Sequence, residues 1–419
     1  MKEITLHQIK DITVTVPGSK SFTHRILIAA ALSDGECHIV NPLRSEDTLL
    51  TLGGLQQLGV PVVMDSDTIR VQGTAGFLKP CADPVFLGNS GTSLRLLTGI
   101  CALGEGAYVL DGVERMRERP IQDLLDGLNQ LGVLAHSVRG NGCPPVFVNG
   151  GRISGGLVRL KCGISSQYLS SMLLLAPYTE AGLEIIVVEG PVSRPYVDMT
   201  LEVMNRLGVS VERDGYTRFR VSGQQVYRSG TYHVEPDCSQ AGYFWGAAAI
   251  GGASVKVTGT TKGSRQGDVR FVEVLAAMGC RVIEEPDGIR VAGGPLTGVD
   301  VDMSDMPDMV PTLAVVAAFA TGDTVIRNVA HLKAKESDRL GSVVAELKKM
   351  GIKADATDTG MVVSGGHPKG AEIETYDDHR IAMSFAIAGL NTPGVMIRDE
   401  GCVRKSFPDF WEVFGRLGE

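Results

Sequence analysis

Residues 343–352 read Val343-Val344-Ala345-Glu346-Leu347-Lys348-Lys349-Met350-Gly351-Ile352, and this stretch contains the repeat from which the architecture can be inferred. Its apolar residues follow helical spacing up to Met350. Gly351 fits a left-handed cap that ends the helix, since glycine tolerates positive φ without a steric penalty. The hydrophobic residues that follow predict a strand, a turn and a second strand.

The same pattern occurs six times in the sequence, with its glycines about 70 residues apart, which is typical of repeated supersecondary units. The copies are Leu58-Gly59-Val60, Leu131-Gly132-Val133, Leu207-Gly208-Val209, Met278-Gly279-Cys280, Met350-Gly351-Ile352 and the terminal Leu417-Gly418. Hairpins are expected after the glycines, for example Val60 to Met64 with Ile69 to Gln72, and Arg281 to Glu284 with Ile289 to Ala292. A chance recurrence of such pairs in a glycine-rich chain is the alternative, but it does not account for the hairpins. Six units predict an α/β protein of two domains with three units each.

The composition agrees with two or more packed units, because 419 residues exceed the usual size of one core. With 43% hydrophobic and 21% charged residues, disorder is not indicated. The apolar stretch from Leu313 to Ala320 is far shorter than the roughly 20 residues of a membrane span. Met1-Lys2-Glu3-Ile4 does not resemble the start of a signal peptide, so we expect a cytoplasmic protein without membrane association.

The charge and the cysteines narrow the function classes further. A net charge of −8 disfavours a nucleic-acid surface, although local cations can still bind small anions. The eight cysteines lie far apart in the sequence and form no Cys-x-x-Cys pair. We therefore expect reduced, mostly buried thiols rather than zinc ligands or disulfides.

Two loops in the first half of the chain have the composition of anion sites. Pro17-Gly18-Ser19-Lys20-Ser21-Phe22-Thr23-His24-Arg25 follows a predicted strand and precedes an apolar helix over 26–32. Gly88-Asn89-Ser90-Gly91-Thr92-Ser93-Leu94-Arg95 runs into a helix predicted over 94–101. Amides at a helix start attract phosphate or carboxylate groups, although a structural turn remains open for the first loop. No glycine-lysine-serine/threonine triplet is present, so ATP is not implied.

Three more segments of the first half carry cations or hydroxyls. In Glu114-Arg115-Met116-Arg117-Glu118-Arg119-Pro120, an extended backbone would place Arg115, Arg117 and Arg119 on one side. Ser165-Ser166-Gln167 precedes a helix over 168–175, which it could cap or equip for phosphate binding. Ser193-Arg194-Pro195-Tyr196 adds a hydroxyl, a guanidinium and a phenol in a turn.

The second half supplies carboxylates next to cations. Asp305-Met306-Pro307-Asp308 leads into a helix predicted over 309–320, where capping or catalysis would suit an acid. In Lys335-Glu336-Ser337-Asp338-Arg339, a helix would put Lys335 and Arg339 one turn apart, with Glu336 pointing elsewhere. Asp377-Asp378-His379-Arg380 precedes a helix over 381–390, and Arg404-Lys405 lies near the end. Together the motifs predict phosphate and carboxylate recognition with proton transfer.

In this order, from Pro17 to Pro408, the motifs resemble the enolpyruvylshikimate-phosphate synthase family. The specific pieces are Gly18-Ser19-Lys20-Ser21 with Arg25, Gly88 to Thr92, Arg115 to Pro120, Ser165 to Gln167, Ser193 to Tyr196, Pro307-Asp308, Lys335-Glu336 with Arg339, and Asp378-His379-Arg380. The resemblance implies the enolpyruvyl transferase fold, an inside-out α/β barrel with two similar domains of three βαβαββ units each. It places the crossovers near Lys20 and Asp237, so that one domain spans 21–236 and the other spans 1–20 with 237–419.

The resemblance also implies the reaction, in which the enolpyruvyl group of phosphoenolpyruvate moves to the 5-hydroxyl of shikimate 3-phosphate on the route to chorismate and aromatic amino acids. It implies no cofactor and no metal, and we expect a monomer that binds only small molecules. The residues implied for shikimate 3-phosphate are Ser21, Arg25, Ser165, Ser166, Gln167, Ser193, Asp308, His331 and Lys335. Those implied for phosphoenolpyruvate are Lys20, Gly91, Arg115, Gln167, Arg339, Arg380 and Lys405.

The catalytic groups so implied are Asp308 as base at the hydroxyl, Glu336 as acid and base at the methyl carbon, and Lys20 as an electrostatic and proton-transfer partner. One position departs from the family pattern, because His331 stands where asparagine is expected. A histidine can still donate a hydrogen bond to phosphate there and would add pH dependence.

Three alternatives stay open at this stage. An enolpyruvyl transferase that acts on a UDP-amino sugar would have a loop cysteine, yet no cysteine lies between Cys101 and Cys143. A non-catalytic anion-binding relic would be expected to lack Asp308, Glu336 or Lys20, and all three are present. RNA-end processing on a similar repeat is disfavoured by the acidic net charge.

Overall fold

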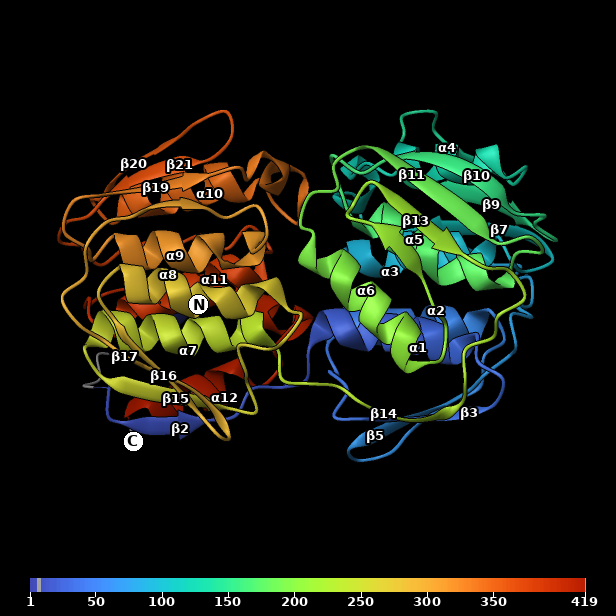
Figure 1. Cartoon of the computed structure of the whole chain (residues 1–419). Coiled ribbons are helices and arrows are strands. Elements are labelled where there is room, and N and C mark those ends of the chain that lie inside the picture. Colours follow the sequence, from blue (N-terminus) through green and yellow to red (C-terminus); the bar gives the residue numbers. More distant parts are fainter. Residues whose placement is uncertain (6–8, 419) are drawn as a thin grey trace. The chain divides into compact units, whose positions relative to one another are not determined.

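The computed structural model describes residues 1–5 and 9–418, and the chain divides into two compact units (Figure 1). Unit 1 consists of Met1–Pro17 with Glu235–Glu419, and unit 2 consists of Gly18–Val234. The chain therefore passes between the units twice. Each unit is described by itself below.

Unit 2 contains three four-stranded sheets, and in each of them one pair of neighbouring strands is parallel and two pairs are antiparallel, as a βαβαββ unit requires. The sheet orders are β6-β7-β9-β8, β10-β11-β13-β12 and β14-β3-β5-β4. The strands are β3 Glu36–Val40, β4 Val62–Met64, β5 Thr68–Gln72, β6 Val85–Phe86, β7 Gly106–Asp111, β8 Leu134–Ser137, β9 Val146–Gly150, β10 Gly156–Lys161, β11 Leu183–Glu189, β12 Glu212–Asp214, β13 Arg218–Val221 and β14 Gly230–His233.

Unit 1 repeats this arrangement with two four-stranded sheets, β16-β17-β15-β2 and β18-β19-β21-β20, and the three-stranded sheet β1-β23-β22. The strands are β1 Lys2–Glu3, β2 Ile12–Val14, β15 Ser254–Thr258, β16 Arg281–Glu285, β17 Gly288–Ala292, β18 Asp300–Asp302, β19 Asp323–Arg327, β20 Lys353–Ala356, β21 Met361–Ser364, β22 Glu372–Ile373 and β23 Met396–Ile397.

Two sheets obtain a strand from a distant part of the sequence. β2 pairs in parallel with β15, with Val14 opposite Val257, and β14 pairs in parallel with β3, with Tyr232 opposite Ile39. These are the two places where the chain leaves one unit and later returns to it. The sixth repeat lacks a hairpin of its own, and β1 from the N-terminus completes its sheet by pairing antiparallel with β23.

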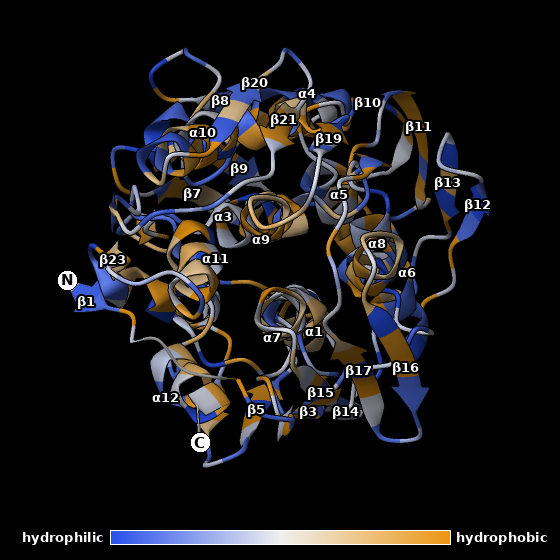
Figure 2. Ribbon diagram, turned by 90° about the vertical axis from the view of Figure 1, so that its left-hand side faces the viewer, coloured by the Kyte–Doolittle hydropathy of each residue, from blue (hydrophilic) through white to orange (hydrophobic). Residues whose placement is uncertain are grey.

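The helices alternate with these strands along the chain. They are α1 Lys20–Ala31, α2 Glu46–Gln57, α3 Gly91–Cys101, α4 Gln122–Gln130, α5 Gln167–Leu175, α6 Pro195–Arg206, α7 Cys238–Gly251, α8 Phe271–Ala277, α9 Val310–Ala317, α10 Arg339–Lys349, α11 His379–Gly389 and α12 Phe410–Gly415. In unit 1, α7, α9 and α11 contact one another, and α9 is buried along its whole length, which agrees with its orange colour in Figure 2. A helix that is apolar on all sides belongs in the centre of a core.

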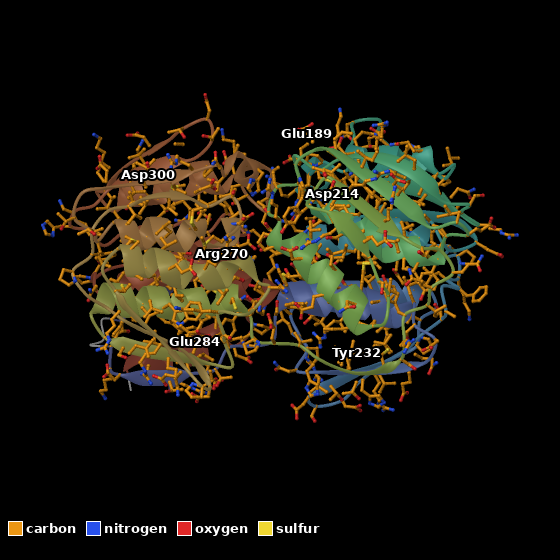
Figure 3. The ribbon with its side chains drawn as sticks, in the orientation of Figure 1. Glu189, Asp214, Tyr232, Arg270, Glu284 and Asp300 are labelled. Atoms are coloured by element: carbon orange, nitrogen blue, oxygen red, sulfur yellow. The ribbon has the colours of Figure 1, made fainter. Side chains whose placement is uncertain are left out.

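The outer faces of the sheets carry charged side chains, and buried and exposed residues alternate along strands such as β3 and β13. Examples labelled in Figure 3 are Glu284 on β16, Asp300 on β18 and Asp214 on β12, all exposed. The inward side chains build one hydrophobic core in each unit.

The predicted helix caps are confirmed at five of the six glycines. Their φ values are +84° at Gly59, +81° at Gly132, +85° at Gly208, +114° at Gly279 and +76° at Gly351. The two hairpins predicted as examples are also confirmed, as β4 with β5 and β16 with β17. Leu417-Gly418 instead lies in a 3₁₀ turn, Arg416–Gly418, where the described chain ends.

Several predicted helix boundaries are wrong, mostly because the helices begin earlier than the apolar pattern suggests. α1 starts at Lys20 instead of 26, α3 at Gly91 instead of 94 and α11 at His379 instead of 381. α9, predicted over 309–320, is shorter. Polar residues at a helix start do not show hydrophobic periodicity, although their backbone is already helical.

All eight cysteines are free thiols, and all except the half-buried Cys81 are buried, as predicted. No helix within residues 1–5 and 9–418 is long and apolar enough to cross a membrane.

Candidate active site

In unit 2, α1, α3 and α5 begin close together, and this convergence brings the predicted motifs of the first half into contact. The Gln167 amide donates to Thr92 Oγ1 at 2.8 Å, and its carbonyl oxygen accepts from Arg95 at 2.8 Å. Arg25 of α1 donates to Ser170 Oγ of α5 at 3.3 Å. Because helix N-termini carry partial positive charge, three of them at one place favour an anion.

Arg25 is a buried cation whose observed hydrogen-bond acceptors are neutral. Its side chain donates to Thr200 Oγ1 at 2.8 Å and to the Ser21 carbonyl at 2.9 Å, and the residue is 1% exposed. Burial lowers the pKa of Arg25 from its usual 12.5 to about 10, since desolvation penalises the charged form. A phosphate beside this guanidinium would offset that penalty.

Lys20 opens α1 and forms an ion pair with Asp47 of α2 at 2.9 Å. The lysine side chain is 12% exposed and the aspartate is buried, so the ammonium is held in place and still reached by solvent. The preceding Ser19 caps α1 through its side chain.

Gly91, at the start of α3, lies directly against the guanidinium of Arg119. A Cβ added at Gly91 would be 2.4 Å from Arg119 NH2. Arg119 is buried and donates to the Asn89 carbonyl at 2.8 Å and to Asn89 Oδ1 at 3.1 Å.

The prediction that three arginines share one side of an extended segment is wrong. Met116–Glu118 forms a 3₁₀ turn, so Arg115 pairs with Glu118 at 2.8 Å while Arg117 pairs with Asp111 at 2.6 Å. Arg119 follows the turn in an extended conformation, as expected for a residue before proline, and this directs it to Asn89. From the sequence, Arg115 and not Arg119 was assigned to a substrate, and Pro120 is the local signal that distinguishes the conformations of the two arginines.

Three further predicted site residues of unit 2 are serines, namely Ser165, Ser166 and Ser193. Ser165 Oγ accepts from the Gln167 amide nitrogen at 3.2 Å, while Ser166 occupies the N-cap position of α5 without a side-chain cap bond. Ser193 is buried with φ +53° just before α6, and the Tyr196 ring of that helix lies 5.9 Å from the Arg25 guanidinium carbon. Ser165 thus binds a backbone amide at the start of α5, whereas the Ser166 side chain makes no such cap bond.

In unit 1, the starts of α7, α9 and α11 converge in the same way. Arg380, at the start of α11, donates to Ser239 Oγ of α7 at 3.3 Å, to Tyr243 Oη at 3.4 Å and to Asp308 Oδ2 at 2.6 Å. Asp308 lies in the 3₁₀ turn Pro307–Met309 that leads into α9. The starts of α7, α9 and α11 thus meet at the Arg380 guanidinium, although Asp308 and Arg380 lie 72 residues apart in the sequence.

Arg339 is surrounded by three carboxylates. It donates to Asp308 Oδ1 at 3.0 Å, to Glu336 Oε2 at 2.9 Å and to Asp378 Oδ2 at 2.8 Å. Although burial disfavours its charge, these carboxylates raise the pKa of Arg339 above its usual value. Asp308 is therefore shared between the guanidinium groups of Arg339 and Arg380.

The predicted helix from Lys335 to Arg339 is wrong. Lys335 follows the 3₁₀ segment Ala330–Ala334 in an extended conformation, Asp338 is the N-cap, and α10 begins at Arg339. Glu336 does not point away from Arg339 but binds it. Asp338 accepts from the Gly341 amide, and an aspartate at this position stops the helix from extending backwards.

Two groups near Asp308 have perturbed pKa values. Burial, and then the charge of Asp308, raises the pKa of Asp268 to about 8, and its Oδ1 is buried without a hydrogen-bond partner. Burial, and then Lys335, lowers the pKa of His331 to about 4, so the imidazole is neutral near pH 7. Lys405 is buried in the 3₁₀ segment Glu400–Lys405 that follows β23.

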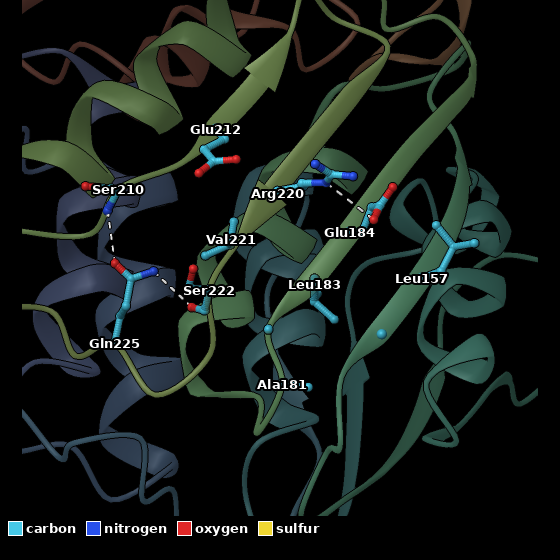
Figure 4. Close-up of a pocket in the computed structure, with 12 residues that line it drawn as sticks. Leu157, Ala181, Leu183, Glu184, Ser210, Glu212, Arg220, Val221, Ser222 and Gln225 are labelled. Carbon is cyan, nitrogen blue, oxygen red and sulfur yellow. Dashed lines mark hydrogen bonds and ion pairs between the residues drawn. The ribbon is translucent and has the colours of Figure 1, made fainter.

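A separate hollow of about 530 Å³ lies on unit 2 beside β11 and β13 (Figure 4). Glu184 pairs with Arg220 across it at 3.4 Å, and Gln225 accepts from the Ser210 amide. None of the predicted site residues lines this hollow. Within residues 1–5 and 9–418, no group of three or more His, Cys, Asp or Glu side chains could hold a metal ion.

Two units of βαβαββ repeats, each with cationic side chains at converging helix starts, are the features to compare with solved structures. The chain has the fold of the enolpyruvyl transferase NikO from Streptomyces tendae, with a TM-score of 0.80 at 22% identity over 99% of this chain and 97% of that one. A solved EPSP synthase from Acinetobacter baumannii has a TM-score of 0.83 at 30% identity, with the same coverage of both chains. The enolpyruvyl transferase fold predicted from the sequence is thus confirmed.

The family model for EPSP synthase (3-phosphoshikimate 1-carboxyvinyltransferase) matches residues 7–414. A chloroplastic 3-phosphoshikimate 1-carboxyvinyltransferase from Arabidopsis thaliana is 44% identical over 438 residues, which cover 99% of this chain and 84% of the relative. The chain therefore belongs to the EPSP synthase family, as its motifs predicted.

Proposed function

We propose that this protein transfers the enolpyruvyl group of phosphoenolpyruvate to the 5-hydroxyl of shikimate 3-phosphate and releases phosphate. The observation that supports it best is the pair of cation clusters in a chain of this family, one cluster in each unit. Both substrates carry several negative charges, so cations must neutralise them before they can react.

We assign the cluster around Arg25 in unit 2 mainly to shikimate 3-phosphate. The hydrogen-bond acceptors of Arg25 are neutral. Arg25 supplies a buried charge, and the hydroxyl and amide groups supply directed hydrogen bonds to phosphate and ring oxygens. The residues assigned there are Ser21, Arg25, Ser165, Ser166, Gln167 and Ser193, and from unit 1 we add Asp308, His331 and Lys335.

Phosphoenolpyruvate is assigned to Arg339, Arg380 and Lys405 of unit 1 and to Lys20, Gly91, Arg115 and Gln167 of unit 2. We add Arg119, because its buried guanidinium borders Gly91 whereas Arg115 is paired at the surface with Glu118. A guanidinium can bind a carboxylate or phosphate through two parallel hydrogen bonds, which suits a planar substrate.

In the first step, the 5-hydroxyl oxygen bonds to C2 of phosphoenolpyruvate, and the electrons of the C2–C3 double bond take a proton at C3. Asp308 accepts the hydroxyl proton and Glu336 or Lys20 donates the proton to C3, which gives a tetrahedral ketal phosphate. Asp308 forms ion pairs with both Arg339 and Arg380. We propose that the incoming anion takes over these arginines, which leaves Asp308 a stronger base.

In the second step, C3 loses a proton, the C2–C3 double bond forms again, and the C2–O bond to phosphate breaks. Glu336 takes this proton, and the cations stabilise the charge on the leaving phosphate. Glu336 is 10% exposed and bound to Arg339, which fixes its orientation.

We further propose that the protein acts as a cytoplasmic monomer on small molecules, without cofactor, nucleic acid or membrane, and that its functional domains are 21–236 and 1–20 with 237–419. Free thiols at all eight cysteines agree with a reducing compartment. The net charge of −8 agrees with the absence of a nucleic-acid surface.

The test is phosphate release by the purified protein with phosphoenolpyruvate and either shikimate 3-phosphate or a UDP-amino sugar. Release that requires shikimate 3-phosphate and falls steeply in Asp308→Ala and Glu336→Gln is the expected result. Asp305→Ala is a matched control, because Asp305 lies three residues away and pairs with Arg270. Release with the UDP-amino sugar, or with neither acceptor, would refute the proposed reaction.

A further inference from the structure

The turn between β22 and α11 has an unusual backbone. Tyr376 and Asp377 both have positive φ values, 54° and 53°, although neither is glycine. Side chains other than glycine rarely adopt this region, and such residues persist where the surroundings hold them in place. Something in the structure must therefore fix this turn.

The carboxylate of Glu346 fixes it. Glu346 is fully buried on α10, and its Oε1 accepts from the Tyr376 hydroxyl at 2.7 Å. Its Oε2 accepts from the Glu374 amide at 3.1 Å and from Lys349 Nζ at 2.8 Å. A buried carboxylate is costly unless it is hydrogen-bonded, so the native conformation of the turn depends on the bonds that Glu346 accepts from the Tyr376 hydroxyl and the Glu374 amide.

The conformation of Tyr376 and Asp377 also determines the position of Asp378, the next residue. This aspartate is fully buried and accepts from Ser337 Oγ at 3.0 Å, from Arg339 Nε at 2.8 Å and from the Arg380 amide at 3.0 Å. It therefore orients the side chain of Arg339 and caps α11, whose second residue is Arg380. Both guanidinium groups then meet at Asp308.

One helix carries both ends of this arrangement. α10 begins at Arg339, and Glu346 follows seven residues later, which is two helical turns and hence the same face. A change at the Tyr376 hydroxyl can reach Arg339 from two directions, through the turn to Asp378 and through α10 itself.

We propose that Glu346 and Tyr376 are a pair of positioning residues that hold Asp378, and through it the guanidinium groups of Arg339 and Arg380, in the geometry that binds phosphoenolpyruvate. The inference rests on the proposed function of these two arginines. Neither Glu346 nor Tyr376 is assigned to a substrate.

Tyr376→Phe is the main test, because it removes one hydroxyl and keeps the ring. The KM for phosphoenolpyruvate is expected to rise about fivefold or more, since hydrogen bonds to charged groups are strong and small displacements of binding groups are costly. The KM for shikimate 3-phosphate should change less than about twofold, because most residues assigned to it lie in unit 2.

Two control variants separate positioning from general stability. Tyr232→Phe also removes one tyrosine hydroxyl bond, to the Arg228 carbonyl at 2.6 Å in unit 2. Lys349→Ala removes a 45% exposed partner of Glu346 and leaves the Tyr376 bond, and exposed ion pairs contribute little. Both controls should keep the wild-type KM for phosphoenolpyruvate.

A second measurement does not depend on activity. The Arg339 Nε–H group is buried against Asp378, so its hydrogen exchange, followed by NMR on protein labelled with ¹⁵N-arginine, should be slow. Arg339→Lys identifies the signal. Exchange should become about tenfold faster in Tyr376→Phe and stay unchanged in Tyr232→Phe.

Unchanged KM and unchanged exchange in Tyr376→Phe would overturn the inference, and so would equal rises of both KM values. If the wild-type protein released no phosphate, the proposed reaction would fail, while the exchange measurement would still decide whether the pair holds Arg339.

Discussion

Each of the two cation clusters contains a buried arginine, and the two arginines differ in whether carboxylates neutralise their charge. In unit 2, the acceptors around Arg25 are hydroxyl and carbonyl oxygens, and burial lowers the pKa of this guanidinium to about 10. In unit 1, Arg339 binds three carboxylates, and its pKa is raised. Both side chains are almost completely buried.

This difference implies two ways of receiving an anion. The charge of Arg25 is not matched by a carboxylate among its hydrogen-bond partners, so an incoming phosphate supplies missing charge. Arg339 and Arg380 are already neutralised through Asp308, so an anion must exchange with a carboxylate. Under the proposed function, this exchange would couple substrate binding to release of the base, whereas the cluster in unit 2 would bind its substrate without displacing a carboxylate.

Asp308→Ala should have the largest effect, and it tests most directly whether an anion exchanges with the carboxylate of Asp308. Loss of a general base costs about 10²- to 10⁴-fold in turnover, so phosphate release should fall by that factor. Binding of phosphoenolpyruvate alone should nevertheless become tighter, because the competing carboxylate is gone. Isothermal titration of the variant, with Asp305→Ala as control, checks this, and weaker binding would contradict the exchange.

Arg25→Met tests the other cluster. We expect kcat/KM to fall about 10²- to 10³-fold, since hydrogen bonds between charged groups are worth about 1.5–3 kcal/mol each. The melting temperature should stay equal or rise, because the substitution removes a buried charge that has no carboxylate hydrogen-bond partner.

The matched control for Arg25→Met is Arg206→Met, which removes an exposed arginine of the same unit and should leave kinetics unchanged. A large fall in the melting temperature of Arg25→Met would show that the guanidinium is a structural element instead.

Gly91→Ala probes the contact with Arg119. The new methyl group would lie 2.4 Å from the guanidinium, which is the far end of a flexible side chain and can move aside. We expect the KM for phosphoenolpyruvate to rise about tenfold with a smaller change in the KM for shikimate 3-phosphate. Steady-state kinetics check this, and Gly53→Ala, where a Cβ meets open space on α2, is the control.

Asp268→Asn should change the pH dependence of stability. The folded pKa of Asp268 is about 8, so between about pH 4 and pH 8 the folded state holds a proton that the unfolded state has lost. Stability therefore falls as pH rises through this window, by at most about 1.4 kcal/mol per pH unit. Urea unfolding midpoints at pH 5, 6 and 7 should fall more steeply for the wild type than for the variant.

His331→Asn should have the smallest effect, and with the opposite sign. The folded pKa is about 4, so between about pH 4 and pH 6.5 the unfolded state binds the extra proton and stability rises with pH. Lys335 and Arg339 oppose protonation and Asp308 favours it. From pH 4.5 to pH 7, the urea midpoint of the variant should rise less, or fall more, than that of the wild type, and an identical change in both proteins would contradict the pKa shift.

The repeat was predictable because its signals are local. A glycine after an amphipathic helix, followed by two short strand-like runs, occurs in the first five copies, and Gly351 with the helix before it is the clearest. The motifs at helix starts were also found, since Ser19 and Asp378 are capping residues next to apolar helices. The segments that the structure brings together at the helix starts were therefore identified from the sequence.

The partners of these residues were not predictable. Apart from the proline after Arg119, no local feature distinguishes the conformations of Arg115 and Arg119, and the helical face expected for Lys335 and Arg339 does not exist. Glu346 drew no attention, because a glutamate in an amphipathic helix is usually on the solvated face.

By itself, the sequence determined the α/β repeats, their helix ends and the chemical types of the site residues, because backbone preferences and hydrophobic periodicity act over a few neighbouring residues. Only the tertiary structure decided which charges are compensated. Thr200 lies 175 residues from Arg25, and Asp308 lies 72 residues from Arg380. Electrostatic state depends on burial and on contacts between such distant segments, so it is fixed only when the repeats pack.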